Sequence, residues 1–370
     1  MKQSRNQEPF MPRPLVSLVA VAALLAACKE EAPVKPKVTP AAAPAPTATG
    51  ILVDSAKLEM FGPLPKAMES KANPLTPEKI SLGRMLYFDA RLSKNHDVSC
   101  NSCHDLAKYG VDGKDVSDGH RKQKGSRNSP TVYDAAAQFV QFWDGRAETV
   151  EEQAKGPVTN PVEMASTPER TVATLESIPG YVEAFKKAFP DDEKPITFDN
   201  FAKAVGAFER KLVTPSKWDD FLEGKKTALS EDEKKGFLKF VEVGCPTCHL
   251  GPLVGGTMYQ KVGKEKPWPN QKDKGRSAIT KSPSDDMMFK TPILRNVDQT
   301  APYFHDASAK TLEDAVKQMA TYQLAKELSE DDVKSIVTWL RTLTGPIPAD
   351  YVKAPTLPES SPKTPKPDPK

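Results

Sequence analysis

The chain of 370 residues is long enough for two domains of ordinary size, and its 38% hydrophobic content can support packed cores. A formal net charge of +3 is too small to favour nucleic-acid binding. Many of the 35 prolines gather near the two ends, which indicates extended tails rather than an unusual fold.

The N-terminus is typical of an export signal. Basic residues precede an apolar run over 15–27 that is too short to span a bilayer comfortably. The run ends at Leu25-Ala26-Ala27-Cys28, which resembles the lipobox of bacterial lipoproteins. We therefore expect a lipoprotein signal peptide over 1–27, lipidation of Cys28 and a periplasmic protein held at a membrane of a Gram-negative bacterium by lipid alone. An ordinary signal peptide with an incidental cysteine stays open, as does a start at Met11.

Two segments contain few large apolar residues. A Pro/Ala-rich stretch over 28–55 is expected to be an extended tether, and the Pro/Lys-rich segment 346–370 is expected to be a disordered tail.

Four of the five cysteines lie in two copies of one pattern, Cys100-Asn101-Ser102-Cys103-His104 and Cys245-Pro246-Thr247-Cys248-His249. C-x-x-C-H is the attachment motif of c-type haem: two thiols bind one porphyrin, and the adjacent histidine binds the iron. A redox dithiol is typical of a βαβ pattern, which this sequence lacks, and a zinc site requires four ligands that lie closer together. A disulfide does not explain the repeated histidine. The sequence therefore predicts two covalently bound haems.

Between the tails the sequence predicts a mostly α fold. Helices are expected to open at Thr76-Pro77-Glu78, at the capping pair Ser230 and Glu233, and near Thr311 and Ser329. Helical periodicity over 168–222 is expected to bridge two domains, with a boundary near 215–228. Each haem motif follows a helix, which indicates two tandem cytochrome c-like domains over residues 56–220 and 221–345.

The ligand opposite each proximal histidine decides what each haem can do. With His104 and His249 proximal, three of the five histidines remain: His96, His120 and His305. A methionine ligand raises the reduction potential, whereas an open or displaceable position permits chemistry.

Ordered motifs around both haem sites, over about 75–345, resemble the bacterial di-haem cytochrome c peroxidases. They are Gly119-His120, Arg127-Asn128-Ser129-Pro130-Thr131, Phe142-Trp143-Asp144-Gly145-Arg146, Gln153, Asn160-Pro161-Val162-Glu163-Met164, Thr291-Pro292-Ile293-Leu294-Arg295-Asn296, Thr300-Ala301-Pro302-Tyr303-Phe304-His305-Asp306 and Met319-Ala320.

The resemblance implies that the N-terminal haem is the peroxidatic centre, with His120 as its displaceable distal ligand. A Gly-rich polar loop over 112–125 can move at low cost, although the sequence alone would favour a solvated loop histidine. The resemblance also makes Glu163 the acid/base that moves a proton to the leaving oxygen of hydrogen peroxide, and Gln153 a hydrogen-bonding partner that cannot supply the proton. Taken alone, both side chains would be expected at the surface.

The same resemblance gives the C-terminal haem Met319 as its sixth ligand and makes it the high-potential centre that receives electrons. Trp143 corresponds to the aromatic residue between the haems. Without the resemblance, both would be interpreted as core residues. Asn128, Thr300 and Pro302 correspond to a calcium site that supplies amide and carbonyl oxygens. His96 and His305 are left without ligand roles.

Three functions remain open. The first is a peroxidase that takes electrons from a small cytochrome c or a cupredoxin, and the resemblance implies a homodimer. The second is a MauG-like oxidase of a partner protein; MauG has a tyrosine opposite its second haem, so Met319 argues against it. The third is a di-haem electron carrier, against which Gln153 and Glu163 argue.

Overall fold

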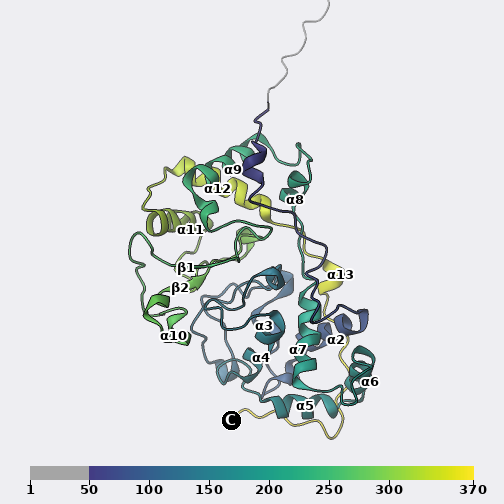
Figure 1. The fold of residues 1–370 in the computed structure, drawn as a ribbon. Helices are drawn as coiled ribbons and strands as arrows, with labels where there is room; N and C mark the ends of the chain where they lie inside the picture. Colours follow the sequence, from purple (N-terminus) through teal and green to yellow (C-terminus); the bar gives the residue numbers. More distant parts are fainter. Residues whose placement is uncertain (1–49) are drawn as a thin grey trace, which may run out of the picture. The chain divides into compact units, whose positions relative to one another are not determined.

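Helices provide most of the regular structure in the computed structural model, which describes residues 50–370 (Figure 1). The prediction of a mostly α fold is confirmed. The signal peptide, Cys28 and most of the tether lie outside the described residues. In residues 50–370 no helix is long and apolar enough to cross a membrane. The helices are α1 (Ser55–Leu58), α2 (Pro77–Phe88), α3 (Cys100–Cys103), α4 (Val150–Thr159), α5 (Pro168–Glu176), α6 (Pro179–Ala188), α7 (Phe198–Glu209), α8 (Lys217–Leu222), α9 (Glu231–Val243), α10 (Ser277–Thr280), α11 (Leu312–Gln318), α12 (Glu330–Leu340) and α13 (Ala349–Val352).

The predicted helix starts are confirmed by their caps. The Thr76 hydroxyl accepts from the backbone N–H of Lys79 at 3.2 Å, so α2 begins at Pro77. Ser230 and Glu233 form the reciprocal capping box that opens α9. Thr311 caps α11 and Ser329 caps α12, because each side chain accepts a hydrogen bond from a backbone N–H of the first turn.

The N-terminal half, defined here as residues 63–212, is built around α2 and α7. Leu82 and Leu86 of α2 and Phe201 and Phe208 of α7 are almost fully buried in one core. Gly83 permits the close approach of the two helices, because a Cβ there would lie 1.9 Å from the carbonyl oxygen of Ala204. The apolar faces of the two helices therefore meet almost backbone to backbone.

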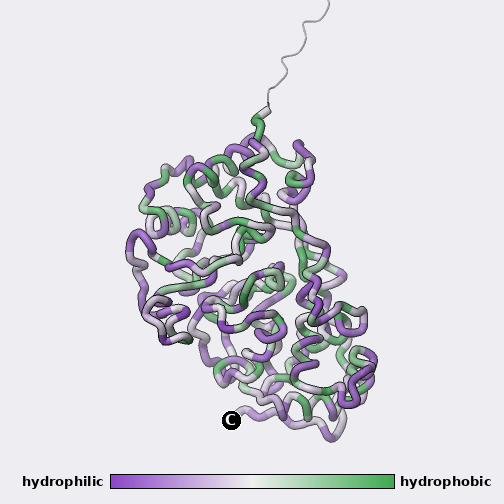
Figure 2. The backbone as a smooth tube through the Cα atoms, viewed as in Figure 1, coloured by the Kyte–Doolittle hydropathy of each residue, from purple (hydrophilic) through white to green (hydrophobic). Residues whose placement is uncertain are grey.

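The C-terminal half, residues 213–345, is built around α9 and α12. Trp218, Phe237, Phe240 and Trp339 form an aromatic cluster, with the Trp218 and Trp339 rings 5.3 Å apart in an edge-to-face arrangement. A short antiparallel pair, β1 (Tyr259–Lys261) and β2 (Met288–Lys290), lies beside this core and pairs Tyr259 with Lys290. Hydrophobic residues along the backbone concentrate inside both halves (Figure 2).

The first residues of the described chain pack on the C-terminal half, and the last residues pack on the N-terminal half. Phe61 joins the aromatic core of the C-terminal half, with its ring 5.7 Å from that of Trp218, and α1 lies near α9 and α12 (Figure 1). The α8 helix also contributes Trp218 and Phe221 to this core. The expected division at 220 thus separates the cores only approximately, because residues 50–62 and α8 pack with the C-terminal half.

The segment after Gly345 is ordered, contrary to the expectation of a disordered tail. In α13, Tyr351 stacks on Phe208 at 5.0 Å and donates to its carbonyl oxygen. Beyond α13 the chain follows the surface of the N-terminal half, where arginines bind its backbone carbonyls: Arg91 binds Pro358 at 2.9 Å and Arg170 binds Lys366 at 2.7 Å. An extended Pro-rich backbone has free carbonyls, so it can be held by hydrogen bonds without a core of its own.

The substitution Arg170→Ala should loosen the end of this tail. A hydrogen bond from a charged donor contributes about 1.5 kcal/mol, so cleavage between residues 359 and 370 in limited proteolysis should accelerate about tenfold. Lys186→Ala is the matched control, because Lys186 is exposed and, in residues 50–370, pairs only with Glu183 of its own helix. Equal cleavage rates in both variants would contradict the account of the tail.

Candidate functional site

The first C-x-x-C-H motif begins as α3 and places His104 at its end. The His104 Nδ1 atom lies 3.0 Å from the carbonyl oxygen of Pro130 and 3.3 Å from that of Gly110. Carbonyl oxygens only accept, so Nδ1 carries the proton and Nε2 is left with its lone pair. Burial lowers the pKa of His104 and keeps the ring neutral. A neutral imidazole fixed through Nδ1 is the form that binds a haem iron.

The second motif repeats this arrangement. Gly244 ends α9 with φ +99°, a left-handed conformation, and the chain turns into Cys245. His249 Nδ1 lies 3.3 Å from the carbonyl oxygen of Val254, and burial lowers the pKa of His249 to about 4. The four motif cysteines form no disulfide, and in residues 50–370 no three His, Cys, Asp or Glu side chains converge as a zinc site would require.

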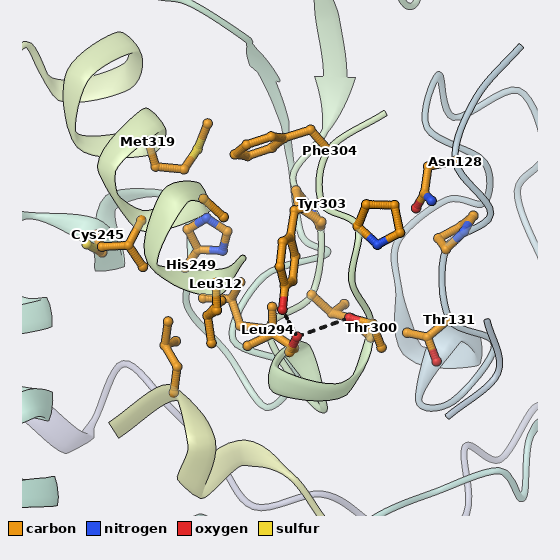
Figure 3. Close-up of a pocket in the computed structure, with 18 of the residues that line it drawn as sticks. Asn128, Thr131, Cys245, His249, Leu294, Thr300, Tyr303, Phe304, Leu312 and Met319 are labelled. Carbon is orange, nitrogen blue, oxygen red and sulfur yellow. Dashed lines mark hydrogen bonds between the residues drawn. The ribbon is translucent and has the colours of Figure 1, made fainter. Parts of the chain in front are cut away.

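A cavity of about 160 Å³ lies beside the second motif (Figure 3). Cys245, His249 and Met319 line it, and most of its other walls are apolar. Met319 follows α11 and opens a short π-helical turn, Met319–Gln323. One thiol of the motif, the neutral histidine and a thioether thus face one apolar space, so these residues fit the haem that the motif implies.

Trp143 contacts both halves of the chain. It lines the second-motif cavity, and its indole N–H donates to the carbonyl oxygen of Asn128 at 2.9 Å. Two residues further along, the Pro130 carbonyl accepts from His104 of the first motif. The backbone of 128–130 therefore contacts both Trp143 and the first proximal histidine. From the other side, the backbone N–H of Lys290 donates to the Trp143 carbonyl at 2.8 Å.

The three residues expected to bind calcium also line this cavity. Asn128, Thr300 and Pro302 come together there from the two halves of the chain. The Asn128 amide nitrogen donates to the carbonyl oxygen of Lys114 at 2.8 Å, and its Oδ1 accepts no hydrogen bond from residues 50–370. The three residues that the resemblance assigns to calcium thus line one cavity.

His120 is buried against the turn that carries Glu163. It is only 4% exposed, and its backbone N–H donates to the Glu163 carbonyl at 2.7 Å. Gly119 allows this contact, since a Cβ there would lie 2.0 Å from the carbonyl oxygen of Val162. The His120 Nδ1 atom is buried and has no hydrogen-bond partner in residues 50–370, and Nε2 lies 3.4 Å from the Lys370 carbonyl oxygen. The interpretation of His120 as a solvated loop histidine is wrong, and a buried imidazole whose Nδ1 has no partner in residues 50–370 fits a metal-ligand role.

The Glu163 carboxylate is largely buried and follows α4 by four residues. Burial raises its pKa, while the Arg146 charge and a 2.8 Å hydrogen bond from Asn160 act in the opposite direction. Gln153 lies half-buried on α4, and no hydrogen bond joins its side chain to Glu163 in the described structure. Gln153 and Glu163, the pair predicted from the sequence, thus lie on α4 and on the turn that follows it.

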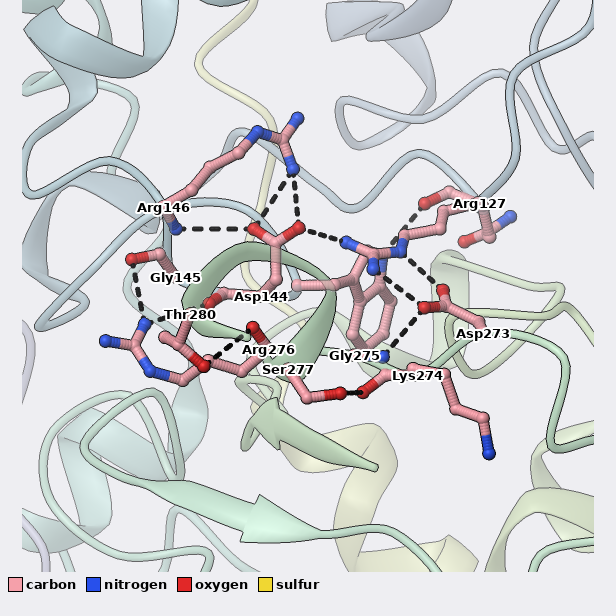
Figure 4. Close-up of polar contacts among 12 residues, drawn as sticks. Arg127, Asp144, Gly145, Arg146, Asp273, Lys274, Gly275, Arg276, Ser277 and Thr280 are labelled. Atoms are coloured by element: carbon pink, nitrogen blue, oxygen red, sulfur yellow. Dashed lines mark hydrogen bonds and ion pairs between the residues drawn. The ribbon is translucent and has the colours of Figure 1, made fainter. Parts of the chain in front are cut away.

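Sequence reasoning missed a network of charged side chains that joins the two halves (Figure 4). Asp144 is 2% exposed and binds two arginines: Arg127 at 2.6 Å, and Arg146 at 2.8 and 3.0 Å. Arg127 also binds Asp273 of the C-terminal half, at 2.5 and 2.8 Å. The Asp144-x-Arg146 spacing indicates an ion pair between these two residues. It does not show that Arg127 binds the same carboxylate, which only the structure reveals.

Comparisons with known proteins identify relatives for most of the chain. Residues 77–227 match the family model described as di-haem cytochrome c peroxidase. Cytochrome c551 peroxidase of Pseudomonas aeruginosa is 47% identical over 83% of this chain and 90% of its own length. That of Nitrosomonas europaea is 48% identical over 80% and 89%. The structure of a MauG-like protein associated with microbial copper homeostasis has a TM-score of 0.68 at 28% identity, covering 79% of this chain and 97% of that one.

Proposed function

Because this chain belongs to the di-haem cytochrome c peroxidases, we propose that it reduces hydrogen peroxide to water with electrons from a small redox protein. The observation that carries the proposal is the contact between His120 and the turn that carries Glu163. Each C-x-x-C-H motif has a neutral, oriented histidine, and the family implies two c-type haems.

When bound, the haems would pass on the electrons of the donor and provide an iron at which peroxide can react. The overall reaction consumes one peroxide, two electrons and two protons and releases two waters. Glu163 would move a proton from one peroxide oxygen to the other, and its raised pKa suits a group that must hold and release a proton. Gln153 would orient peroxide or a water by hydrogen bonds, and His120 would be the displaceable ligand of the first haem.

Electrons would enter at the C-terminal haem and pass to the N-terminal one. Met319 supports this direction, because a thioether ligand raises the potential of the haem that it binds. Trp143 lines the second-motif cavity and donates to the Asn128 carbonyl, two residues before the Pro130 carbonyl that contacts His104, so it would lie on a hydrogen-bonded route toward His104. A small cytochrome c or a cupredoxin would be the donor.

Calcium, assembly and location belong to the same proposal. Asn128, Thr300 and Pro302 would bind one calcium ion where the two halves meet, which would couple their packing. The protein would act as a homodimer in the periplasm, anchored through lipidated Cys28.

Donor oxidation tests the activity. Purified protein carrying both haems is mixed with a reduced small cytochrome c, and hydrogen peroxide is added. We expect two donor molecules to be oxidised for each peroxide consumed. Oxidation no faster than in the protein-free mixture would contradict the peroxidase proposal and favour the electron carrier.

The substitution Met319→Leu should lower the reduction potential of the second haem and slow donor oxidation, because the iron loses its thioether ligand. Potentiometric titration followed in the visible spectrum measures the change. Met258→Leu, which removes a thioether outside the cavity, should leave the potential unchanged. A second haem that lacks methionine ligation in the unaltered protein would instead favour the MauG-like function, which the similarity to a MauG-like structure keeps open.

A further inference from the structure

Arg146 is held in one orientation by contacts on two sides. Its Nη1 atom binds both oxygens of buried Asp144, and its guanidinium lies over the Phe142 ring, 3.5 Å from the ring centre. Phe142 in turn packs against α4, where a Cβ at Gly156 would lie 3.0 Å from the ring. The arginine is thus fixed beside the helix that carries Gln153.

The fixed guanidinium keeps unused hydrogen-bond donors. Nε and Nη2 make no hydrogen bond or ion pair with any of residues 50–370, and the side chain is 36% exposed. Its positive charge favours the ionised form of the Glu163 carboxylate and so acts to lower the pKa of that group. Arg146 therefore offers a positive charge and free N–H groups on the side of the N-terminal half where the proposed peroxide site lies.

We propose that Arg146 is a further residue of the peroxide site, where it binds small anions and stabilises negative charge that develops on oxygen, and that Asp144 is its positioning residue. The inference rests on the proposed function. Arg146 neither gives nor takes a proton: the two electrons come from the donor, and Glu163 handles proton transfer. A pre-oriented guanidinium in a partly dry site is suited to this role, because it needs no reorganisation when charge appears.

The network also makes the position of Arg146 depend on the other half of the chain. Asp144 is shared between Arg146 and Arg127, and Arg127 is bound through two nitrogens to Asp273. If Asp273 is neutralised, Arg127 is free to draw Asp144 away from Arg146. Three ion pairs, Asp273–Arg127, Arg127–Asp144 and Asp144–Arg146, thus connect the C-terminal half to the proposed anion site. We therefore expect the packing of that half to change the affinity of the site for anions.

Azide binding tests the inference without relying on turnover. In the protein carrying both haems, with the first haem open, azide is titrated and its dissociation constant is read from the visible spectrum. Arg146→Gln should weaken azide binding about tenfold, because one charge-assisted hydrogen bond is lost. Arg146→Lys should restore most of the affinity, and Asp144→Asn should weaken it several-fold. Asp273→Asn should have a smaller effect in the same direction.

The matched control is Asp199→Asn, which removes an ion pair that exposed Asp199 forms with Lys155 of α4. Its azide affinity should equal that of the unaltered protein. The inference is overturned if Arg146→Gln binds azide normally, or if Asp199→Asn weakens it equally. Should Arg146→Gln fail to fold, unchanged affinity in Asp144→Asn overturns it instead. Absence of peroxide turnover in the unaltered protein would refute the proposed function alone, since azide binding is measured separately.

Discussion

Replacing Glu163 with glutamine should lower peroxide turnover by about two to four orders of magnitude, the usual contribution of a general acid–base group. Glutamine keeps the size and the hydrogen bond from Asn160 but cannot carry a proton between the two oxygens. The steady-state rate of donor oxidation at saturating peroxide measures the loss. Both haems should still load, and the spectrum should stay close to that of the unaltered protein.

Glu152→Gln is the matched control for this prediction. Glu152 lies on α4 next to Gln153, is exposed and pairs with Lys155 on the same helix. Its loss should leave turnover within about a factor of two, since surface ion pairs contribute little. Full turnover in the Glu163→Gln variant would remove Glu163 from the acid/base role and point to a water or another group.

Replacing Arg295 with methionine should destabilise the protein by about 3–5 kcal/mol, the usual effect of removing one partner from a buried ion pair. Arg295 is 1% exposed and binds both oxygens of Asp219, at 2.6 and 2.9 Å. The same carboxylate accepts the backbone N–H groups of Leu64 and Ser216, so it joins segments distant in sequence. Urea unfolding followed by circular dichroism measures the change.

Two further variants separate a buried pair from a surface pair. Arg341→Met removes an arginine that is 56% exposed and bound to Asp298, and it should cost less than about 1 kcal/mol. Adding Asp219→Asn to Arg295→Met should recover part of the loss, because the unpaired buried charge is gone. Equal stability of the Arg295 and Arg341 variants would show that the buried pair contributes no more than a surface contact.

Local features of the sequence predicted the elements and the haem motifs well. Caps such as Thr76 and Ser230 act within one helical turn, so they can be read without the tertiary structure. The spacing in C-x-x-C-H is fixed by the dimensions of the porphyrin, and the two histidines are oriented by carbonyls a few residues to 26 residues away.

Features that depend on long-range contacts were harder to predict. The composition of 346–370 indicates disorder, but Arg91 and Arg170 of the N-terminal half bind the backbone carbonyls of this segment. Nothing in the sequence of the segment itself indicates these contacts. Burial of His120 depends on a glycine that lets two loops touch. The role of Arg146 depends on Asp144 and on an aspartate more than 100 residues away, so it required the structure.

The most direct test of the central claim is the reaction of half-reduced protein with peroxide. One electron is added to the protein carrying both haems, the visible spectrum is recorded, and hydrogen peroxide is mixed in. We expect the second haem to take the electron, the first to become high-spin with His120 displaced, and peroxide to be consumed rapidly once a reduced small cytochrome c supplies the second electron. If both haems stay low-spin and the peroxide persists, the division between an electron-receiving haem and a peroxide-reducing haem is contradicted.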